Sequence, residues 1–298
     1  GPPQAWTRRS FIRAGLAGSA TLASIRWGFA EETPMPPKFA TSSDGTQIAY
    51  DQAGSGPALV LVGGALSQRA DWAPIARLLS ASFTVMSIDR RGRGHSGDAA
   101  SYGADREIED IAAVIGAAGG TAFVHGQSSG AVLCLRLADR HPDKVSKLSV
   151  YEPPLILDDS RPPAPVDASQ RIAEFVGANK RDEAVSYWMT DVVGAPAEAV
   201  EAMKTAPTWP DLEALAHTLP YDLALVGDLM SGRPLPAGIW GEATMPILVM
   251  SGGASQEWVQ ASAKTLANTL PLAEHRTLEG QTHNAAPEVL APVIERFF

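Results

Sequence analysis

The sequence predicts an α/β protein with a mostly parallel, doubly wound sheet that is interrupted by a block of helices. From residue 38 to about 155, short apolar runs alternate with stretches of helical periodicity. This alternation is typical of a parallel sheet covered by helices on both faces. The periodicity is helical from 156 to 243, and the alternation returns after that. We therefore expect a core formed by 37–155 and 244–298 and a helical cap formed by 156–243.

The individual elements follow from apolar patterning and turn residues. Residues 38–53 are predicted to form a hairpin, because Asp44-Gly45 provides a tight bend between two strand-like runs. The run ALVLV at 58–62 has the continuous apolar character of a strand buried on both faces. The same criteria predict further strands at 83–88, 121–125, 145–151, 246–251 and 273–278, and helices at 69–80, 104–117, 129–140, 255–269 and 286–297.

Composition excludes several classes of protein. The 298 residues are 45% hydrophobic and 19% charged, which is an ordinary globular balance and not that of a disordered chain. There are 24 basic and 33 acidic residues, and a net charge of -9 gives no electrostatic reason to bind nucleic acid. The single cysteine, Cys134, excludes an intrachain disulfide and multi-cysteine zinc sites. No apolar run approaches 20 residues, so we expect no stable membrane insertion.

Residues 1–36 have the layout of an export leader followed by a linker. The pair Arg8-Arg9 precedes the weakly apolar, uncharged segment 14–24, and Gly28-Phe29-Ala30 then provides small residues at alternate positions. This pattern resembles a twin-arginine signal, which implies export to the periplasm. The alternative is an ordinary amphipathic N-terminal helix, and the protein would then be cytoplasmic.

A candidate nucleophile lies between a predicted strand and a predicted helix. Residues 126–130 read Gly-Gln-Ser-Ser-Gly, which fits the pattern G-x-S-x-G in the strand–turn–helix context that this motif requires. The flanking glycines permit a sharp turn that would lift the Ser128 hydroxyl above the sheet. A helix N-terminus beside Ser128 would favour negative charge that develops there.

These features resemble the α/β-hydrolase superfamily over essentially all of 38–298. The resemblance includes the strand that ends in Gly-Gly, the loop Asp-Arg-Arg-Gly-Arg-Gly-His-Ser at 89–96, the Ser128 turn, an inserted cap and a late histidine. It implies the α/β-hydrolase fold. It also implies that backbone N–H groups hold the reaction's oxyanion, here those of Ala65 and Ser129, with Gly64 beside the substrate. Many relatives have His-Gly where this chain has Gly63-Gly64.

The resemblance also places the catalytic base. His283 lies in a loop between the last predicted strand and the last predicted helix, where the superfamily has its catalytic histidine. It could take the Ser128 proton and return it to the leaving group. Of the six histidines, only His125 is a rival, because it is next to the Ser128 turn. We expect His125 to be a core histidine with satisfied hydrogen bonds.

The expected acid departs from the commoner pattern. Most relatives have an aspartate in the loop after the strand at 246–251, but here Ser255 is in that position. Glu152 instead follows the strand at 145–151 and precedes two prolines, and the chain order Ser, Glu, His is kept. This arrangement is similar to that of some dehalogenases and of the resorcylic lactone (zearalenone) hydrolases, and the latter also share a Ser-Ser-Gly turn. Glu257 is the alternative acid.

The resemblance implies a serine hydrolase that cleaves a small-molecule ester or lactone without a cofactor or metal. Trp188, Trp209 and Tyr221 of the cap are candidates for substrate binding. Dehalogenase chemistry is disfavoured because its nucleophile is a carboxylate, whereas a haloperoxidase-like side activity could use the same triad. The alternative of another class is a ligand-binding, receptor-like protein on a retained hydrolase scaffold. The sequence leaves the substrate and the oligomeric state open.

Overall fold

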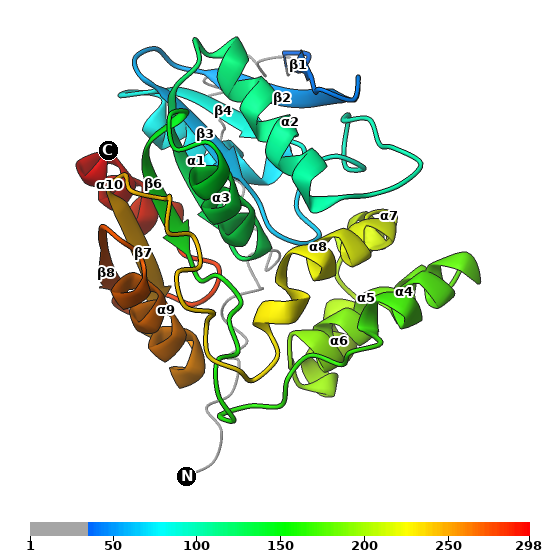
Figure 1. Ribbon diagram of the computed structural model, residues 1–298. Helices are drawn as coiled ribbons and strands as arrows, with labels where there is room; N and C mark the ends of the chain where they lie inside the picture. The colour runs from blue at the N-terminus through cyan, green and yellow to red at the C-terminus, as the bar shows by residue number, and fades with distance from the viewer. Residues whose placement is uncertain (1–34) are drawn as a thin grey trace, which may run out of the picture.

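The computed structural model describes residues 35–298, so the expected export signal lies outside the described residues. One eight-stranded sheet runs through the molecule in the order β1-β2-β4-β3-β5-β6-β7-β8 (Figure 1). Its strands are β1 Lys38–Thr41, β2 Gln47–Ala53, β3 Ala58–Val62, β4 Thr84–Ile88, β5 Ala122–Gln127, β6 Val145–Tyr151, β7 Ile247–Gly252 and β8 Ala273–Leu278.

The sheet is antiparallel at one edge and parallel elsewhere. β1 pairs with β2 as the expected hairpin, β2 pairs antiparallel with β4, and every other neighbouring pair is parallel. The register places Val62 opposite Gly126 and Gln127 opposite Tyr151. The carboxyl ends of the central strands are therefore level, and the residues that follow them meet at one edge of the sheet, where parallel sheets place their ligands.

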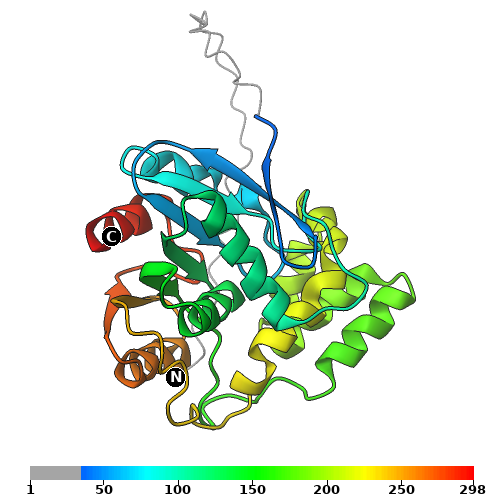
Figure 2. The same ribbon diagram turned by 45° about the horizontal axis from the view of Figure 1, so that its top comes forward.

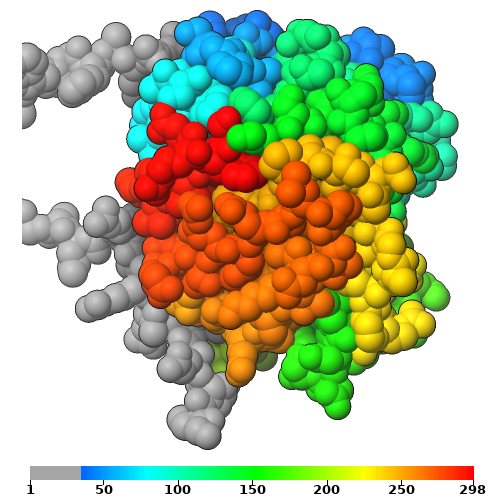
Figure 3. Space-filling model, turned by 60° about the vertical axis from the view of Figure 1, so that its left-hand side comes forward, coloured from blue at the N-terminus to red at the C-terminus, as the bar shows by residue number. Residues whose placement is uncertain are grey.

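Helices cover both faces of the sheet (Figure 1). In the space-filling view of Figure 3, the C-terminal part of the chain, coloured orange to red, forms much of the surface on one side. α1 and α10 pack against each other over one hydrophobic cluster, which includes Leu61 and Leu248. α2, α3 and α9 cover the other face, where the larger cluster includes Val60 and Val249. This double coverage explains the continuous apolar runs of the central strands. The helices are α1 Ala73–Leu79, α2 Ala104–Ala117, α3 Ser129–Arg140, α9 Glu257–Thr269 and α10 Pro287–Phe297.

The chain between β6 and β7 is helical and lies beyond one end of the sheet (Figures 1 and 2). α8 of this insert packs against α3, where the Arg136 guanidinium donates a hydrogen bond of 2.8 Å to the Leu225 carbonyl. The insert contains α4 Ala168–Gly177, α5 Arg181–Tyr187, the π-helix Trp188–Val192, α6 Ala197–Met203, α7 Trp209–Ala214, the 3₁₀ turns Ala216–Thr218 and Gly227–Leu229, and α8 Leu219–Val226.

Outside the insert, the predicted bounds agree with the structure to within two residues at each end, except for one helix, and two of the differences are informative. The helix expected at 69–80 is a 3₁₀ turn, Arg69–Trp72, followed by α1. Pro74 lies in the first turn of α1, where the backbone N–H that proline lacks would have no partner within the helix. The strand expected at 121–125 begins one residue later and continues to Gln127. It is longer because β6 pairs with it as far as Gln127. Gly126 is therefore part of the strand, and the turn at Ser128 is correspondingly sharper.

No helix within residues 35–298 is both long enough and apolar enough to cross a bilayer.

Candidate active site

Ser128 occupies a strained turn between β5 and α3. Its φ of 55° and ψ of -127° lie outside the regions that non-glycine residues ordinarily adopt. Close packing accounts for the two glycines beside it. A Cβ at Gly126 would lie 2.7 Å from the Cys134 sulfur, and one at Gly130 would lie 2.4 Å from the Gly63 carbonyl oxygen. The geometry is that of a nucleophile elbow, with the hydroxyl held at the carboxyl edge of the sheet.

The loop after β3 lies directly against Ser128. A Cβ at Gly64 would come within 2.9 Å of the Ser128 Cβ, so only glycine leaves the backbone this close to the hydroxyl. The Ser67 hydroxyl donates a 2.8 Å hydrogen bond to the Gly64 carbonyl and closes the loop. Leu66 has a positive φ of 59°, which marks a sharp bend just after Ala65. The loop thus places the segment with the two expected contributors, Gly64 and Ala65, at the candidate nucleophile.

Glu152 and His283 are brought together from segments 131 residues apart. His283 Nδ1 lies 2.7 Å from a Glu152 carboxylate oxygen, Oε2. The Glu152 side chain is almost wholly buried, whereas 42% of the His283 side chain is exposed. Among the hydrogen bonds of residues 35–298, none joins His283 Nε2 to the Ser128 hydroxyl, so the structure shows the contact between acid and base but not one between base and nucleophile. The expected contact between acid and base is therefore present.

The second carboxylate oxygen of Glu152 is held by the last residue of β7 and by a residue of the loop that follows it. Oε1 accepts a 2.8 Å hydrogen bond from the Gly252 N–H and another from the Ser255 hydroxyl. Ser255, which replaces the commoner aspartate, therefore supports the carboxylate at Glu152. Glu152 itself has a φ of 48°, so two strained residues, Glu152 and Ser128, face this site. The alternative acid, Glu257, is exposed at the start of α9.

Two further side chains fix the backbone around His283, and the sequence analysis did not identify them. The Gln127 side-chain amide donates a 2.9 Å hydrogen bond to the His283 carbonyl. The Tyr151 hydroxyl donates a 2.5 Å hydrogen bond to the Thr282 carbonyl. Gln127 directly precedes Ser128, and Tyr151 directly precedes Glu152. This adjacency to a candidate catalytic residue is the signal that could have identified them.

His125 is a core residue, but the expectation that its hydrogen bonds are satisfied is only half right. The ring is fully buried and packs edge-on against Trp72. Nδ1 lies 2.7 Å from the Ser149 hydroxyl, but Nε2 has no partner within the described chain. Burial lowers the pKa of His125 to about 3, so its imidazole is neutral at physiological pH.

The three residues of the insert that are candidates for substrate binding pack against other side chains or form hydrogen bonds with them. Trp188 and Trp209 are buried in the larger hydrophobic cluster. Tyr221 donates a 2.8 Å hydrogen bond to Asp98, and its ring stacks on Tyr102 at 4.2 Å between centroids. These contacts indicate packing roles, and contact with substrate stays a prediction for all three.

A buried charge cluster that the sequence analysis missed connects the insert to the candidate site. Arg90 forms a bidentate pair with Glu107 and a 2.8 Å ion pair with Asp222 of α8. Arg93 pairs with the other Asp222 oxygen at 2.7 Å, and the Ser129 hydroxyl donates to Asp222 at 2.6 Å. Burial by itself would raise the pKa of Asp222, but the two guanidinium groups hold it below its ordinary value. The members of the cluster come from four segments that are separate in the sequence, so no local sequence pattern predicts that they lie together.

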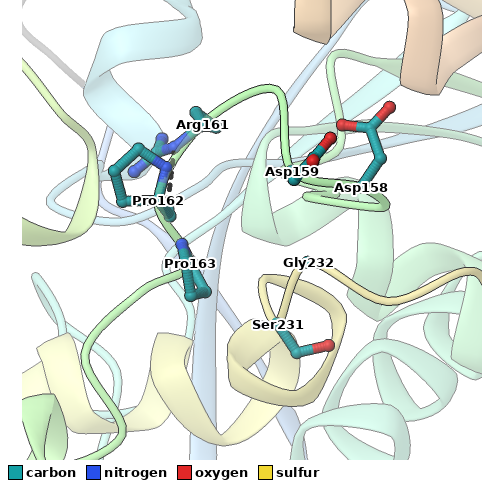
Figure 4. A pocket seen from close by; sticks show the side chains of 7 residues that line it. All are labelled: Asp158, Asp159, Arg161, Pro162, Pro163, Ser231 and Gly232. Carbon is teal, nitrogen blue, oxygen red and sulfur yellow. Dashed lines mark hydrogen bonds between the residues drawn. The ribbon is translucent and has the colours of Figure 1, made fainter.

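Two surface hollows lie away from these residues. One, of about 410 Å³, is formed where the chain leaves the core for the insert and returns to it; it is lined by Asp158, Asp159, Arg161, Pro162, Pro163, Ser231 and Gly232 (Figure 4). The other lies beside the edge strand β8 and is lined by Glu274, Arg276, Arg296 and Phe297. Neither contains a candidate catalytic residue. Within residues 35–298, no three His, Cys, Asp or Glu side chains gather as metal ligands.

Comparisons with known proteins agree with the fold. Residues 59–293 match the family model described as "Alpha/beta hydrolase family". An alpha/beta hydrolase from Sphaerobacter thermophilus is 50% identical, with a TM-score of 0.83, over 88% of this chain and 100% of that chain. Lipase LipV of Mycobacterium tuberculosis is 29% identical over 70% of this chain and 75% of its own length. The 2-(acetamidomethylene)succinate hydrolase of Mesorhizobium japonicum is 26% identical, over 82% and 88% respectively.

The expected fold is confirmed by the eight-stranded, mostly parallel sheet flanked by helices. The family model spans most of the sequence, from β3 into α10, and includes the turn at Ser128. Together these findings show that the chain belongs to the alpha/beta hydrolase family.

Proposed function

We propose that this protein is a serine hydrolase that cleaves a carboxylic ester or lactone through an acyl-enzyme. The Ser128 hydroxyl attacks the carbonyl carbon while His283 Nε2 takes its proton. The tetrahedral oxyanion is held by the N–H groups of Ala65 and Ser129. When the C–O bond breaks, His283 returns the proton to the leaving oxygen. Water then attacks the acyl carbon while His283 Nε2 takes a proton from it. The bond to the Ser128 oxygen breaks, His283 returns the proton to that oxygen, and the acid is released.

The observation that carries this proposal is the hydrogen bond between Glu152 and His283. At 2.7 Å from Nδ1, the carboxylate places the ring proton on that nitrogen and leaves Nε2 to act as base. Glu152 also stabilises the imidazolium that forms in the transition state. Because the carboxylate is buried and held by Gly252 and Ser255, its orientation is fixed before substrate binds.

Two features favour a lactone within this class. The acid follows β6, and Ser255 occupies the usual position of the aspartate, as in the resorcylic lactone hydrolases that the sequence resembles. In a lactone, the leaving alcohol stays attached to the acyl group, so hydrolysis yields one hydroxy acid. Lipase LipV supports an ester substrate in general, since its printed name describes it as a lipase. We further propose that the Arg8-Arg9 segment directs export to the periplasm.

Covalent labelling tests the proposed nucleophile. A fluorophosphonate probe should label the wild-type protein at Ser128, and Ser128→Ala should abolish both labelling and turnover of a p-nitrophenyl ester. Ser146→Ala, a change at an exposed serine of β6, is the matched control and should keep both. Labelling that survives Ser128→Ala would sink the serine-hydrolase proposal. A protein that binds lactones without turning them over would instead support the receptor-like alternative.

A further inference from the structure

Helix α8 of the insert delivers one carboxylate to the place where α3 begins. Asp222 is fully buried, and its Oδ1 accepts a 2.6 Å hydrogen bond from the hydroxyl of Ser129, the first residue of α3. The same oxygen lies 2.8 Å from Arg90 Nη1, and Oδ2 lies 2.7 Å from Arg93 Nη2. Asp222 lies on a helix outside the sheet and its flanking helices. It therefore connects the insert to Ser129, the residue directly after the candidate nucleophile.

The same cluster reaches the other side of the site. Arg90 Nη1 also donates to the Gly63 carbonyl, at 3.4 Å, and Gly63 begins the loop that leads to Ala65. One Asp222–Arg90 pair thus contacts both segments from which an oxyanion donor would come, through the Gly63 carbonyl in the β3 loop and through the Ser129 side chain at the start of α3. An oxyanion hole works only when its donors are fixed before the charge develops.

The buried charges of the cluster oppose any movement of α8 away from the core. Arg90 and Arg93 are balanced by Glu107 and Asp222, and none of these four residues is more than 3% exposed. Moving α8 away would leave two guanidinium groups with a single carboxylate in a buried environment, which is strongly unfavourable. α8 is therefore anchored to the core, whatever the rest of the insert does.

We propose that Asp222 is a positioning residue for the oxyanion hole, so that the docking of α8 sets the donor geometry at Ser129 and in the Gly63–Ala65 loop. The inference rests on the proposed serine-hydrolase function. Asp222 itself does not touch substrate. Its carboxylate orients Ser129 directly and Gly63 through Arg90. The insert is in this respect part of the catalytic machinery.

The test compares Asp222→Asn, Ser129→Ala and the double variant. Active sites are titrated with a fluorophosphonate, and kcat per titrated site is measured with p-nitrophenyl acetate. Loss of a hydrogen bond to a charged group lowers the rate of a step that depends on it by about tenfold to a hundredfold. We therefore expect kcat per site to fall by about that factor in Asp222→Asn and about tenfold in Ser129→Ala, with little change in KM. Both changes act on one hydrogen bond, Asp222→Asn by removing the charge of its acceptor and Ser129→Ala by removing its donor, so their effects on kcat should combine to less than their product in the double variant.

A second measurement separates positioning from simple stability. A trifluoromethyl ketone forms an oxyanion on Ser128, so its affinity should fall in parallel with kcat, whereas affinity for the substrate's acid product should hold. Tyr102→Phe is the matched control: it removes a hydroxyl that donates to Glu107 at the far side of the same cluster. It should lower the melting temperature and leave kcat per site unchanged.

The outcomes are distinguishable. If the wild type is not titrated by the fluorophosphonate, the proposed function fails. If the wild type is titrated and active, but kcat per site is unchanged in Ser129→Ala, or the two effects multiply in the double variant, only the role of Asp222 is overturned. Should Asp222→Asn fail to fold, Ser129→Ala still decides the question, because it leaves both ion pairs of Asp222 intact.

Discussion

Replacing Glu152 by glutamine removes one charge at the centre of the proposed triad and keeps the shape of the side chain. In the structure, one carboxylate oxygen accepts from His283 Nδ1, and the other accepts from the Gly252 N–H and the Ser255 hydroxyl. A glutamine has only one acceptor oxygen. That oxygen is required on the side of Gly252 and Ser255, because two donors converge there.

The consequence is a wrong tautomer of the base. With its oxygen held by Gly252 and Ser255, the glutamine presents its NH₂ group to His283 Nδ1. That nitrogen must then be unprotonated, and the ring proton moves to Nε2, which can no longer accept the Ser128 proton. A comparable change in serine proteases lowers kcat by about 10⁴. At about 1.36 kcal/mol per tenfold, this loss is roughly 5.4 kcal/mol of transition-state stabilisation.

The assay is kcat per titrated site with an ester substrate, measured for Glu152→Gln, Glu152→Asp and the matched control Glu257→Gln. Glu257 is exposed at the start of α9, so its variant should retain nearly full activity. Glu152→Asp keeps the charge at a shorter reach and should fall between the two. The reasoning is refuted if Glu152→Gln keeps more than about a tenth of wild-type kcat, or if Glu257→Gln is equally impaired.

Three further predictions concern other parts of the chain. Arg8→Lys combined with Arg9→Lys should retain the protein in the cytoplasm of a host with twin-arginine transport; unchanged periplasmic activity would show that the leader is of another type. Trp209→Ala should lower the melting temperature by removing a buried side chain; a raised KM for bulky esters, but not for acetyl esters, at an unchanged melting temperature would instead indicate a substrate wall. His125, with a pKa lowered to about 3, stays neutral in the folded state while its unfolded counterpart gains a proton below about pH 6.5. The free energy of unfolding should therefore decrease as the pH is lowered, and urea titrations at pH 6.5 and 5 should show wild type losing about 1.6 kcal/mol more than His125→Gln; equal losses would contradict this.

The sequence by itself was enough to predict the sheet, most helices and the candidates Ser128, Glu152 and His283. These signals are local. A continuous apolar run identifies a strand buried on both faces, and glycines before and after a serine identify a sharp turn between a strand and a helix. The resemblance to the α/β-hydrolase superfamily then placed the candidate acid and base after particular strands, and a parallel sheet gathers such residues at one edge.

Only the tertiary structure decided how these residues are held. Ser255 supports the carboxylate of Glu152 across 103 positions of sequence, and Asp222 contacts Ser129 across 93. The partnerless Nε2 of His125 likewise depends on which side chains surround it in the core. A hydrogen bond between distant segments leaves no periodicity or spacing in the sequence, because its geometry is set by the packing of whole elements. The candidate residues can therefore be proposed from local pattern and family resemblance, whereas their orientation is fixed by contacts that exist only once β6, β7, α3 and α8 have packed together.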